Sequence, residues 1–212
     1  NQNQGFSNMV KISILMAVHN GEAHVHSAIE SVLNQTFTDW EFIIIDDGST
    51  DGTLDLINKY HKIDSRIKVI SIPRCGQTRA LNVGLSNCTG QYIARLDADD
   101  ISLDSRLSLQ HQWISSCEKN VLIGCRLILK HGNKTVRRWT GQYPTNVTVL
   151  RRHLEYRNVF SHSSIMFCRE IKGKRIFYDE RFRYAQDYEL VTRLAKCGRI
   201  RNMKDKLIVY KL

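Results

Sequence analysis

Short apolar runs alternate with amphipathic stretches through the first hundred residues, and this alternation limits what the chain can fold into. Runs such as KISILMA and WEFIII are typical of buried strands, whereas the stretches between them carry apolar residues at helical spacing. The predicted strands are residues 11–17, 40–45, 67–72 and 92–96, and the predicted helices are residues 23–35, 53–60 and 78–85. Because strand–helix repeats connect through right-handed crossovers, the pattern predicts an α/β fold with a Rossmann-like, mostly parallel sheet and helices on both faces.

The second half of the chain follows a less regular pattern. The predicted elements there are helices at residues 103–117, 147–154 and 188–196 and strands at 121–129 and 164–168. The 212 residues, of which 42% are hydrophobic, can fill one sizeable core but not two, so the sequence predicts a single domain. Residues 1–10, which open with the polar NQNQG, are predicted to be a disordered start outside that domain.

Membrane and redox signals are weak in this sequence. No apolar run reaches the roughly eighteen residues that a membrane span needs, and no signal peptide is visible. The six cysteines form no C-x-x-C pair and show no zinc-site spacing. These features predict a cytoplasmic protein with reduced thiols.

The net charge of +10 indicates an anionic partner. Nucleic acid, an anionic membrane surface and a phosphorylated small molecule would each fit, and so would a solvated basic face without a partner. The basic clusters lie at residues 137–138, 151–153, 172–175 and 199–206. Charge alone therefore selects no function.

Polar residues gather where three of the predicted strands end. The first strand ends in AVHN at residues 17–20, the second in DDGS at 46–49 and the fourth in DADD at 97–100. Each motif alone also fits a turn or a helix cap. Ligands of open parallel sheets bind beyond the carboxyl ends of the strands, so together they predict a site. The turn after the first strand has Gly21 as its one glycine, and no P-loop motif occurs, which excludes ordinary dehydrogenases and NTPases.

Asp97 and Asp99 form a D-x-D pair at the end of the fourth predicted strand. Alternate residues of an extended chain point the same way, so both carboxylates can face one ligand. Such hard oxygen ligands suit Mn²⁺ or Mg²⁺ bridging to a diphosphate.

The motifs AVHN, DDGS and LDADD, followed by Asp187 in AQDYEL, together resemble the inverting family-2 glycosyltransferases of GT-A fold. The segment HSSIMF at residues 162–167 agrees with this resemblance, which covers residues 11–212. A weaker resemblance is to the glycosyltransferase domain of a large algal virus. The family implies a nucleotide-binding half at residues 11–100 and an acceptor-binding half of the same domain at residues 101–212.

The resemblance implies roles in donor binding for residues of the first half. Ala17, His19 and Asn20 would line the nucleotide, with the His19 ring stacked on the base. Asp46 or Asp47 would accept a hydrogen bond from the pyrimidine N3–H. In addition, Asp97 would contact the ribose or the metal, Asp99 would bind the metal, and Arg79 and Asn82 would face the diphosphate or the donor sugar.

Asp187 is the predicted general base of this reaction. Inverting transfer needs a carboxylate that accepts the proton of the attacking hydroxyl while charge on the leaving diphosphate is neutralised. Asp187 also fits an N-cap of the helix predicted at residues 188–196, and both roles are compatible. His162 fits a structural histidine, and the three tryptophans, Trp40, Trp113 and Trp139, fit core positions better than sugar platforms.

The predicted function is therefore metal-assisted, inverting transfer from a nucleotide-sugar donor to a hydroxyl of a glycan or glycoprotein, with a UDP-sugar favoured and a dTDP-sugar as the alternative. A sugar-nucleotide nucleotidyltransferase would need a Gly-rich basic loop, which AVHNGEAH lacks. A nucleic-acid-binding module would need basic residues interleaved with aromatic ones near the acidic motifs. We therefore expect no nucleic-acid partner. The basic clusters could instead bind the surface of an anionic membrane.

Overall fold

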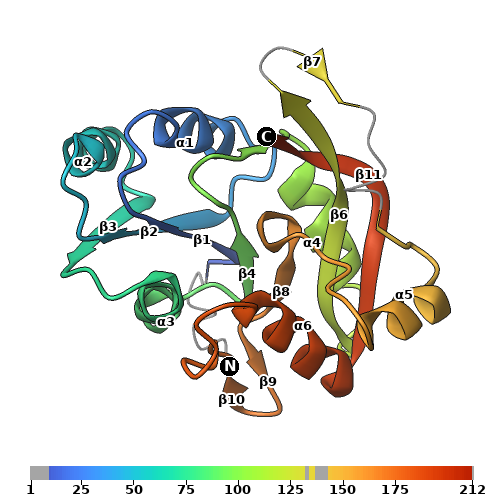
Figure 1. Ribbon diagram of the computed structural model, residues 1–212. Coiled ribbons are helices and arrows are strands. Elements are labelled where there is room, and N and C mark those ends of the chain that lie inside the picture. Colours follow the sequence, from blue (N-terminus) through green and yellow to red (C-terminus); the bar gives the residue numbers. More distant parts are fainter. Residues whose placement is uncertain (1–9, 132–133, 137–142, 212) are drawn as a thin grey trace, which may run out of the picture.

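The computed structural model describes residues 10–131, 134–136 and 143–211 of the chain. In this part, nine strands form one sheet, and two short strands form a separate hairpin (Figure 1). The strand order in the sheet is β3–β2–β1–β4–β8–β6–β11–β5, with β7 paired to β6. The strands are β1 (Ile12–Val18), β2 (Trp40–Asp47), β3 (Ile67–Ile72), β4 (Tyr92–Arg95), β5 (Ile101–Ser102), β6 (Asn120–His131), β7 (Lys134–Thr135), β8 (Met166–Cys168), β9 (Glu170–Ile171), β10 (Lys174–Arg175) and β11 (Arg199–Lys211).

Six α-helices occur in the same part of the chain, together with one 3-10 turn. The helices are α1 (Val25–Leu33), α2 (Thr53–Ile63), α3 (Gln77–Asn87), α4 (Arg106–Ile114), α5 (Val147–Leu154) and α6 (Gln186–Cys197), and the 3-10 turn is His162–Ser164.

The long strand pairings are parallel. β1 pairs with β2 and β4, β2 pairs with β3, and β6 pairs with β11 in this way. The short antiparallel strand β8 lies between β4 and β6 and joins the two parallel parts. The second half of the chain thus extends the sheet begun by the first half. The predicted single α/β domain is confirmed.

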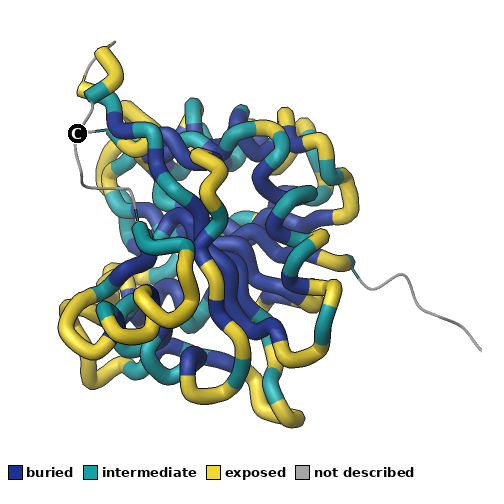
Figure 2. Tube along the Cα trace, turned by 90° about the vertical axis from the view of Figure 1, so that its right-hand side faces the viewer, coloured by how far each residue is buried: buried dark blue, intermediate teal, exposed yellow. Residues whose placement is uncertain are grey.

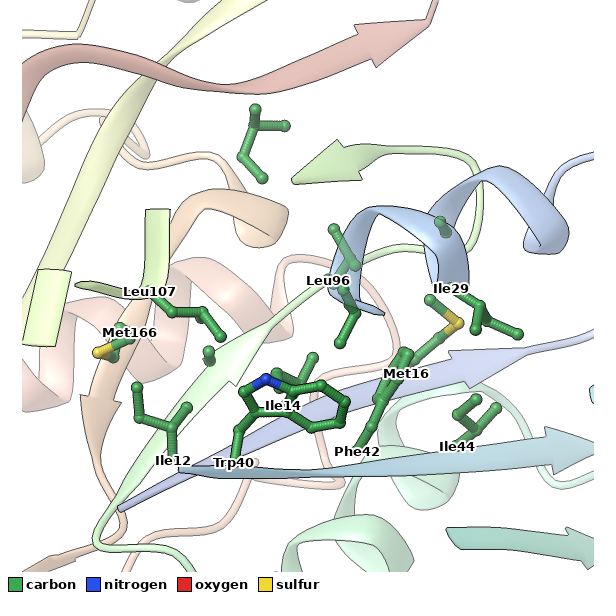
Figure 3. Packing of buried hydrophobic residues seen from close by; sticks show 14 of the residues in the cluster. Ile12, Ile14, Met16, Ile29, Trp40, Phe42, Ile44, Leu96, Leu107 and Met166 are labelled. Atoms are coloured by element: carbon green, nitrogen blue, oxygen red, sulfur yellow. The ribbon is translucent and has the colours of Figure 1, made fainter. Parts of the chain in front are cut away.

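Helices cover both faces of the sheet, as the apolar runs predict. Successive side chains of a strand enter opposite faces. Ile12, Ile14 and Met16 of β1 therefore pack toward α1, α2 and α4 (Figure 3), while Leu15 packs toward α3, α5 and α6. In Figure 2 the buried strands run through the middle of the molecule between more exposed helices. With two packed faces, the carboxyl edge of the sheet remains open to a ligand.

The predicted elements occur with shifted boundaries. The helix predicted at residues 103–117 spans residues 106–114, because the Leu103 N–H binds the Leu207 carbonyl (2.9 Å) and belongs to the sheet edge. The strand predicted from residue 164 begins only at Met166. The sequence pattern does not predict β5, β7, β9, β10 or most of β11, since two-residue strands and polar strands carry little periodic signal.

Several smaller expectations also meet the structure. Trp40 is buried in the core and Trp113 packs against that core, as predicted. Three other expectations fall on residues that the structure does not describe: the disordered start (up to residue 9), the basic pair at 137–138 and Trp139. All six cysteines are free thiols. Within the described residues, no helix has the length and apolar character needed to cross a bilayer.

Candidate functional site

Four adjoining cavities lie beyond the carboxyl ends of β1, β2 and β4, and Gln77 at the start of α3 lines all of them. The β1–β2 cavity (about 220 Å³) is lined by Ala17, Val18, His19, Asp47, Arg74, Gly76 and Gln77. The β1–β4 cavity (about 240 Å³) is lined by residues 17–21, His24, Gln77 and residues 97–99. The carboxylate cavity (about 600 Å³) is lined by Gln77, Asp97, Asp99, His162, residues 183–187 and Tyr210. The arginine cavity (about 650 Å³) is lined by residues 74–79, Glu180 and Arg183.

The four cavities together form a cleft, and one of the two carboxylates of the DDGS motif lines it. Asp46 is buried, and its carboxylate accepts a hydrogen bond from the Ser71 hydroxyl (3.0 Å). Asp47 lines the β1–β2 cavity and accepts hydrogen bonds from the main-chain N–H groups of Cys75 (2.7 Å) and Gly76 (3.0 Å). Because neighbouring strand residues point to opposite faces, Asp47 is the one of the two that can meet a ligand.

Gly48 allows the turn after β2 to approach the segment that leads into α3. Its φ of +65° lies in the left-handed region, and a Cβ at this position would lie 2.7 Å from the Arg74 nitrogen. Glycine has no side-chain penalty for either demand. The turn therefore holds the segment of residues 74–76 against Asp47.

His19 and Asn20 lie where β1 ends. The His19 ring lines two cavities and its Nδ1 lies 2.8 Å from the Asp47 carbonyl oxygen. Asn20 has a φ of +53°, which asparagine tolerates better than most residues, and its side-chain oxygen accepts a hydrogen bond from the Thr50 N–H (2.8 Å). Ala17 lines the same two cavities as His19. Ala17, His19 and Asn20, predicted to line the nucleotide, thus lie on one wall of the β1–β4 cavity. The side-chain oxygen of Asn20, however, is already hydrogen-bonded to Thr50.

A buried arginine, Arg95, binds the Asp97 carboxylate on the side of the protein core. Arg95 is fully buried and its guanidinium forms an ion pair with the Asp97 carboxylate. The same guanidinium donates to the Leu15 carbonyl (3.1 Å), and Ser163 Oγ donates to the other Asp97 oxygen (2.8 Å). Burial raises the pKa of Asp97, but the Arg95 guanidinium, His162 and the Ser163 hydrogen bond together outweigh burial, and the net pKa is lowered. Asp97 is therefore ionised at neutral pH and fixed in place.

Asp99 is exposed and lines both the β1–β4 and the carboxylate cavities beside Asp97. Asp100 is buried instead, and burial raises its pKa to about 7. In the described part of the chain, no three His, Cys, Asp or Glu residues are grouped to hold a metal by themselves. Two carboxylates on an open cleft nevertheless fit Mn²⁺ or Mg²⁺, since Mg²⁺ commonly takes its remaining ligands from phosphates and water.

Asp187 enters the carboxylate cavity from the first turn of α6. Its carboxylate accepts a hydrogen bond from the Asn158 side chain (2.8 Å). The N-cap of the helix is Ala185, with a φ of +58°, so the interpretation of Asp187 as the cap is wrong, although its charge still suits the helix dipole. Beside it, the Gln186 amide donates to the Gln77 side chain (2.9 Å) and joins the starts of α6 and α3.

His162 lies on the wall of the carboxylate cavity as a neutral side chain. Its Nε2 lies 2.7 Å from the Tyr178 hydroxyl oxygen, and the two rings meet edge to face at 5.6 Å. Burial, with a further contribution from Arg95, lowers the pKa of His162 to about 3. The histidine therefore contributes a polar ring and no charge.

The two residues predicted on α3 differ in their placement. Arg79 lines the arginine cavity and forms an ion pair with Glu180 (3.3 Å). Asn82 lines none of the four cavities, because its amide donates to the Tyr178 carbonyl (3.0 Å) and accepts from the Tyr178 N–H (2.8 Å). The expectation that Asn82 faces the donor is corrected: it joins α3 to the segment before α6.

Sequence reasoning missed Gln77 and Tyr210, which line the cavities. It also missed Arg95, Asn158 and Ser163, which bind the carboxylates of Asp97 and Asp187. The sequence does contain an indication of Arg95: a charged residue within the apolar run YIARL needs a charged or polar partner if the strand is buried. The others reach the cleft from distant segments, and no local pattern marks them.

The strand order of the sheet and the helices on both of its faces are those of the GT-A fold. A family model described as "Glycosyl transferase family 2" matches residues 13–174. The chain belongs to this family.

Known proteins agree with this assignment. The O-antigen biosynthesis glycosyltransferase WbnJ of Escherichia coli is 32% identical over 208 residues, which cover 95% of this chain and 79% of WbnJ. Among solved structures, Staphylococcus aureus TarS 1-349 in complex with UDP superposes with a TM-score of 0.76 at 20% identity, covering 95% of this chain and 60% of TarS 1-349. The mannosyltransferase PcManGT of Pyrobaculum calidifontis, in complex with GDP-Man and Mn²⁺, superposes with a TM-score of 0.73 at 18% identity, covering 94% of this chain and 56% of PcManGT. The chain thus spans less than two thirds of either solved structure.

Proposed function

We propose that this chain transfers a sugar from a nucleoside diphosphate donor to an acceptor hydroxyl, with a UDP-sugar as the favoured donor and a dTDP-sugar as the alternative. One observation carries the proposal: Asp97, Asp99 and Asp187 line a single cavity of about 600 Å³, which adjoins the cavity of His19 and Asp47 through Gln77. Metal-binding carboxylates, a candidate base and a nucleotide wall are the three parts that such a transfer needs.

The nucleotide would occupy the β1–β2 cavity. Its base would stack on His19 beside Ala17, and its N3–H would donate to the Asp47 carboxylate, which lines that cavity. Asp46 would act indirectly, because it lines none of the four cavities and its carboxylate is bound to Ser71. Arg79 would contact the diphosphate or the donor sugar from the arginine cavity. The structure of TarS 1-349 in complex with UDP supports the choice of a uridine nucleotide.

A divalent cation, Mn²⁺ or Mg²⁺, would be held by Asp99 with Asp97, and PcManGT with GDP-Man and Mn²⁺ supports this choice. When bound, the cation neutralises charge on the departing diphosphate. Arg95 and Ser163 keep the Asp97 carboxylate ionised and oriented toward the cavity.

Asp187 would act as the general base and accept the proton of the attacking hydroxyl. Asn158 donates to one carboxylate oxygen (2.8 Å), and no other described residue donates to the second oxygen, which can take up that proton. A single base of this kind supports one displacement at the anomeric carbon, which inverts its configuration. Residues 11–100 would hold the donor, and residues 101–212 would supply the base and the acceptor surface.

The acceptor side of the proposal is a glycan or glycoprotein hydroxyl, as the name of WbnJ suggests for its own reaction. Family membership favours this function over nucleotidyl transfer and over nucleic-acid binding. The basic clusters around residues 151–153 and 199–206 are candidates for peripheral contact with an anionic membrane, and a cytoplasmic location stays a prediction.

A donor screen tests the function. The protein is incubated with UDP-, dTDP- and GDP-sugars and Mn²⁺, and the released nucleotide and the anomer of the freed sugar are followed by NMR. We expect hydrolysis of a UDP-sugar with inversion, and loss of this activity on chelation of the metal. Retention of configuration would contradict the single-displacement assignment, and failure of every nucleotide to bind in the presence of Mn²⁺ would contradict the function itself.

A further inference from the structure

The loop that leads into α6 places an exposed aromatic ring beside the candidate base. Tyr184 is 79% exposed, yet it lines the carboxylate cavity together with Asp187. Between them, Ala185 adopts a left-handed conformation, which costs an alanine free energy and turns the chain from the loop into the helix. An exposed tyrosine held at the mouth of a polar cavity offers a flat apolar surface with a polar tip.

Positive charge lies directly behind this ring. Arg183 lines both the carboxylate and the arginine cavities, and its guanidinium lies 5.9 Å from the centre of the Tyr184 ring. In the arginine cavity, Arg79 is already paired with Glu180. Among the described residues, no carboxylate lies within ion-pairing distance of Arg74 or Arg183, so both guanidinium groups can bind an anion from outside the protein.

The two features combine into one binding surface. An aromatic face binds the apolar face of a sugar ring, whereas a guanidinium binds a carboxylate or a phosphate through two parallel hydrogen bonds. The charge of such a ligand would lie toward the arginine cavity and away from Asp97 and Asp99. The hydroxyl that attacks would then face Asp187, since the base and Tyr184 line the same cavity.

We propose that the acceptor is an anionic carbohydrate, whose ring stacks on Tyr184 and whose carboxylate or phosphate binds Arg183. The inference rests on the proposed function, because it takes Asp187 as the base. It adds a substrate class: acceptors that carry a uronic acid or a sugar phosphate.

The test compares three acceptors that differ only in the group at C6, which is neutral in p-nitrophenyl glucoside and anionic in p-nitrophenyl glucuronide and p-nitrophenyl glucoside 6-phosphate. Transfer is measured with the UDP-sugar that the protein hydrolyses fastest, on the wild type, Arg183→Gln and Tyr184→Ala. Arg181→Gln and Tyr156→Ala are matched controls, because Arg181 lines none of the four cavities and Tyr156 is 80% exposed elsewhere on the surface. The glucuronide and the phosphate separate the two sources of negative charge.

We expect the wild type to use a charged acceptor at least tenfold better than the neutral glucoside, the difference that one charged hydrogen bond can make. Arg183→Gln should remove this preference by raising the acceptor KM, and Tyr184→Ala should raise the KM for all three acceptors. Donor hydrolysis and UDP affinity are measured on the same proteins, because Arg183 and Tyr184 line cavities that the donor would also use. The two controls should leave both quantities unchanged, and in the two variants the acceptor KM should change more than the UDP affinity.

Three results would overturn the inference. They are a wild type without preference for either charged acceptor, a wild type that uses no acceptor while it hydrolyses the donor, and an Arg183→Gln variant that weakens UDP binding but not acceptor use. Absence of donor hydrolysis in the wild type would instead contradict the proposed function. The two failures are therefore distinguishable.

Discussion

At the residue scale, the carboxylates of the cleft differ in what holds them. Asp97 is bound by Arg95 and Ser163, so its side chain is also part of the packing beneath the cleft. Asp187 has one hydrogen-bond donor, Asn158. Asp99 is exposed on the cleft wall. A substitution of Asp97 should therefore affect both activity and stability, whereas substitutions of Asp187 and Asp99 should affect mainly activity.

Asp99→Ala should remove Mn²⁺-stimulated UDP binding and leave the melting temperature within about 2 °C of the wild type, because an exposed side chain contributes little to folding. Calorimetric titration of UDP with and without Mn²⁺ measures the effect. Asp97→Asn is the informative contrast, since loss of its charge leaves the buried Arg95 unpaired and should lower the melting temperature as well. An Asp99→Ala protein with normal Mn²⁺ dependence would remove Asp99 from the metal site.

Asp187→Asn should slow transfer by a factor on the order of 10²–10⁴, the usual range for a lost general base. Donor affinity and melting temperature should stay normal, because the substitution keeps the shape of the side chain and its oxygen can still accept from Asn158. Transfer rate, UDP affinity and melting are measured on the same preparation.

Transfer above a tenth of the wild-type rate, with binding and melting unchanged, would mean that Asp187 is not the base. The other carboxylates near the start of α6 are engaged in ion pairs: Asp179 with Arg181, Glu180 with Arg79 and Glu189 with Arg193. Of these, Glu180 would be examined next, because it lines the arginine cavity.

At the scale of elements, the site depends on how the ends of strands and the starts of helices meet. The turn after β2 presses against the segment before α3, and the start of α3 is joined to the start of α6 through Gln77 and Gln186. The three elements that carry the proposed nucleotide wall and the candidate base are thereby fixed to one another by short contacts.

Gly48→Ala tests the contact between the turn and the segment before α3. The added Cβ would meet the Arg74 nitrogen at 2.7 Å in a left-handed conformation, so both strain and displacement of that segment are expected. Gly173→Ala is the matched control, with a φ of +73° and nothing within 4 Å of its Cβ. We expect a cost of about 1–2 kcal/mol for the control and at least about twice that for Gly48→Ala.

UDP affinity separates the two variants further. Gly48→Ala should weaken UDP binding, because Asp47 accepts its hydrogen bonds from the displaced segment, while Gly173→Ala should not. Equal losses of stability and unchanged UDP affinity in both variants would show that the turn does not support the nucleotide wall.

At the scale of the whole molecule, one buried carboxylate connects three neighbouring strands of the sheet and the loop before a fourth. Glu41 on β2 accepts hydrogen bonds from Ser13 on β1 (2.6 Å), from Lys68 on β3 (2.7 Å) and from the Thr89 N–H before β4 (2.6 Å). Burial of Glu41 raises its pKa, but these donors, led by Lys68, outweigh burial and lower the pKa to about 2.

Acid should therefore destabilise the fold through Glu41. Because the folded pKa of about 2 lies below the ordinary value of 4.5, the carboxylate contributes its stability above pH 4.5 and loses it as the pH falls toward 2. The contribution at neutral pH is on the order of 3 kcal/mol, because the pKa falls from 4.5 to about 2. Chemical denaturation of the wild type and of Glu41→Gln between pH 7 and pH 2.5 measures it.

Glu41→Gln should be less stable than the wild type at pH 7, and the difference should shrink toward pH 2.5, since glutamine has no charge to lose. Glu22→Gln serves as a control carboxylate on the surface. A constant difference between wild type and Glu41→Gln across this range would show that the Glu41 charge does not stabilise the sheet.

The amino-acid sequence by itself determined the elements of the first half and the place of the site. Apolar periodicity acts between near neighbours, so β3 begins and ends where the pattern predicts it, and the other predicted strands and helices of the first half shift by a few residues. In the second half, α5 also has its predicted bounds. The motifs AVHN, DDGS and DADD lie at strand ends, and parallel pairing of β1 with β2 and β4 necessarily brings those ends to one edge.

Only the tertiary structure decided which side chains meet within that edge. It separated Asp47 from Asp46, bound Asn82 to Tyr178, and placed Asn158 on Asp187 and Arg95 beneath Asp97. Contacts such as Asn82 with Tyr178 join residues 96 positions apart, and they depend on how whole helices and loops pack. A local sequence pattern predicts which face of its own helix or strand a residue occupies. Whether side chains of two different elements touch depends on all the side chains packed between those elements.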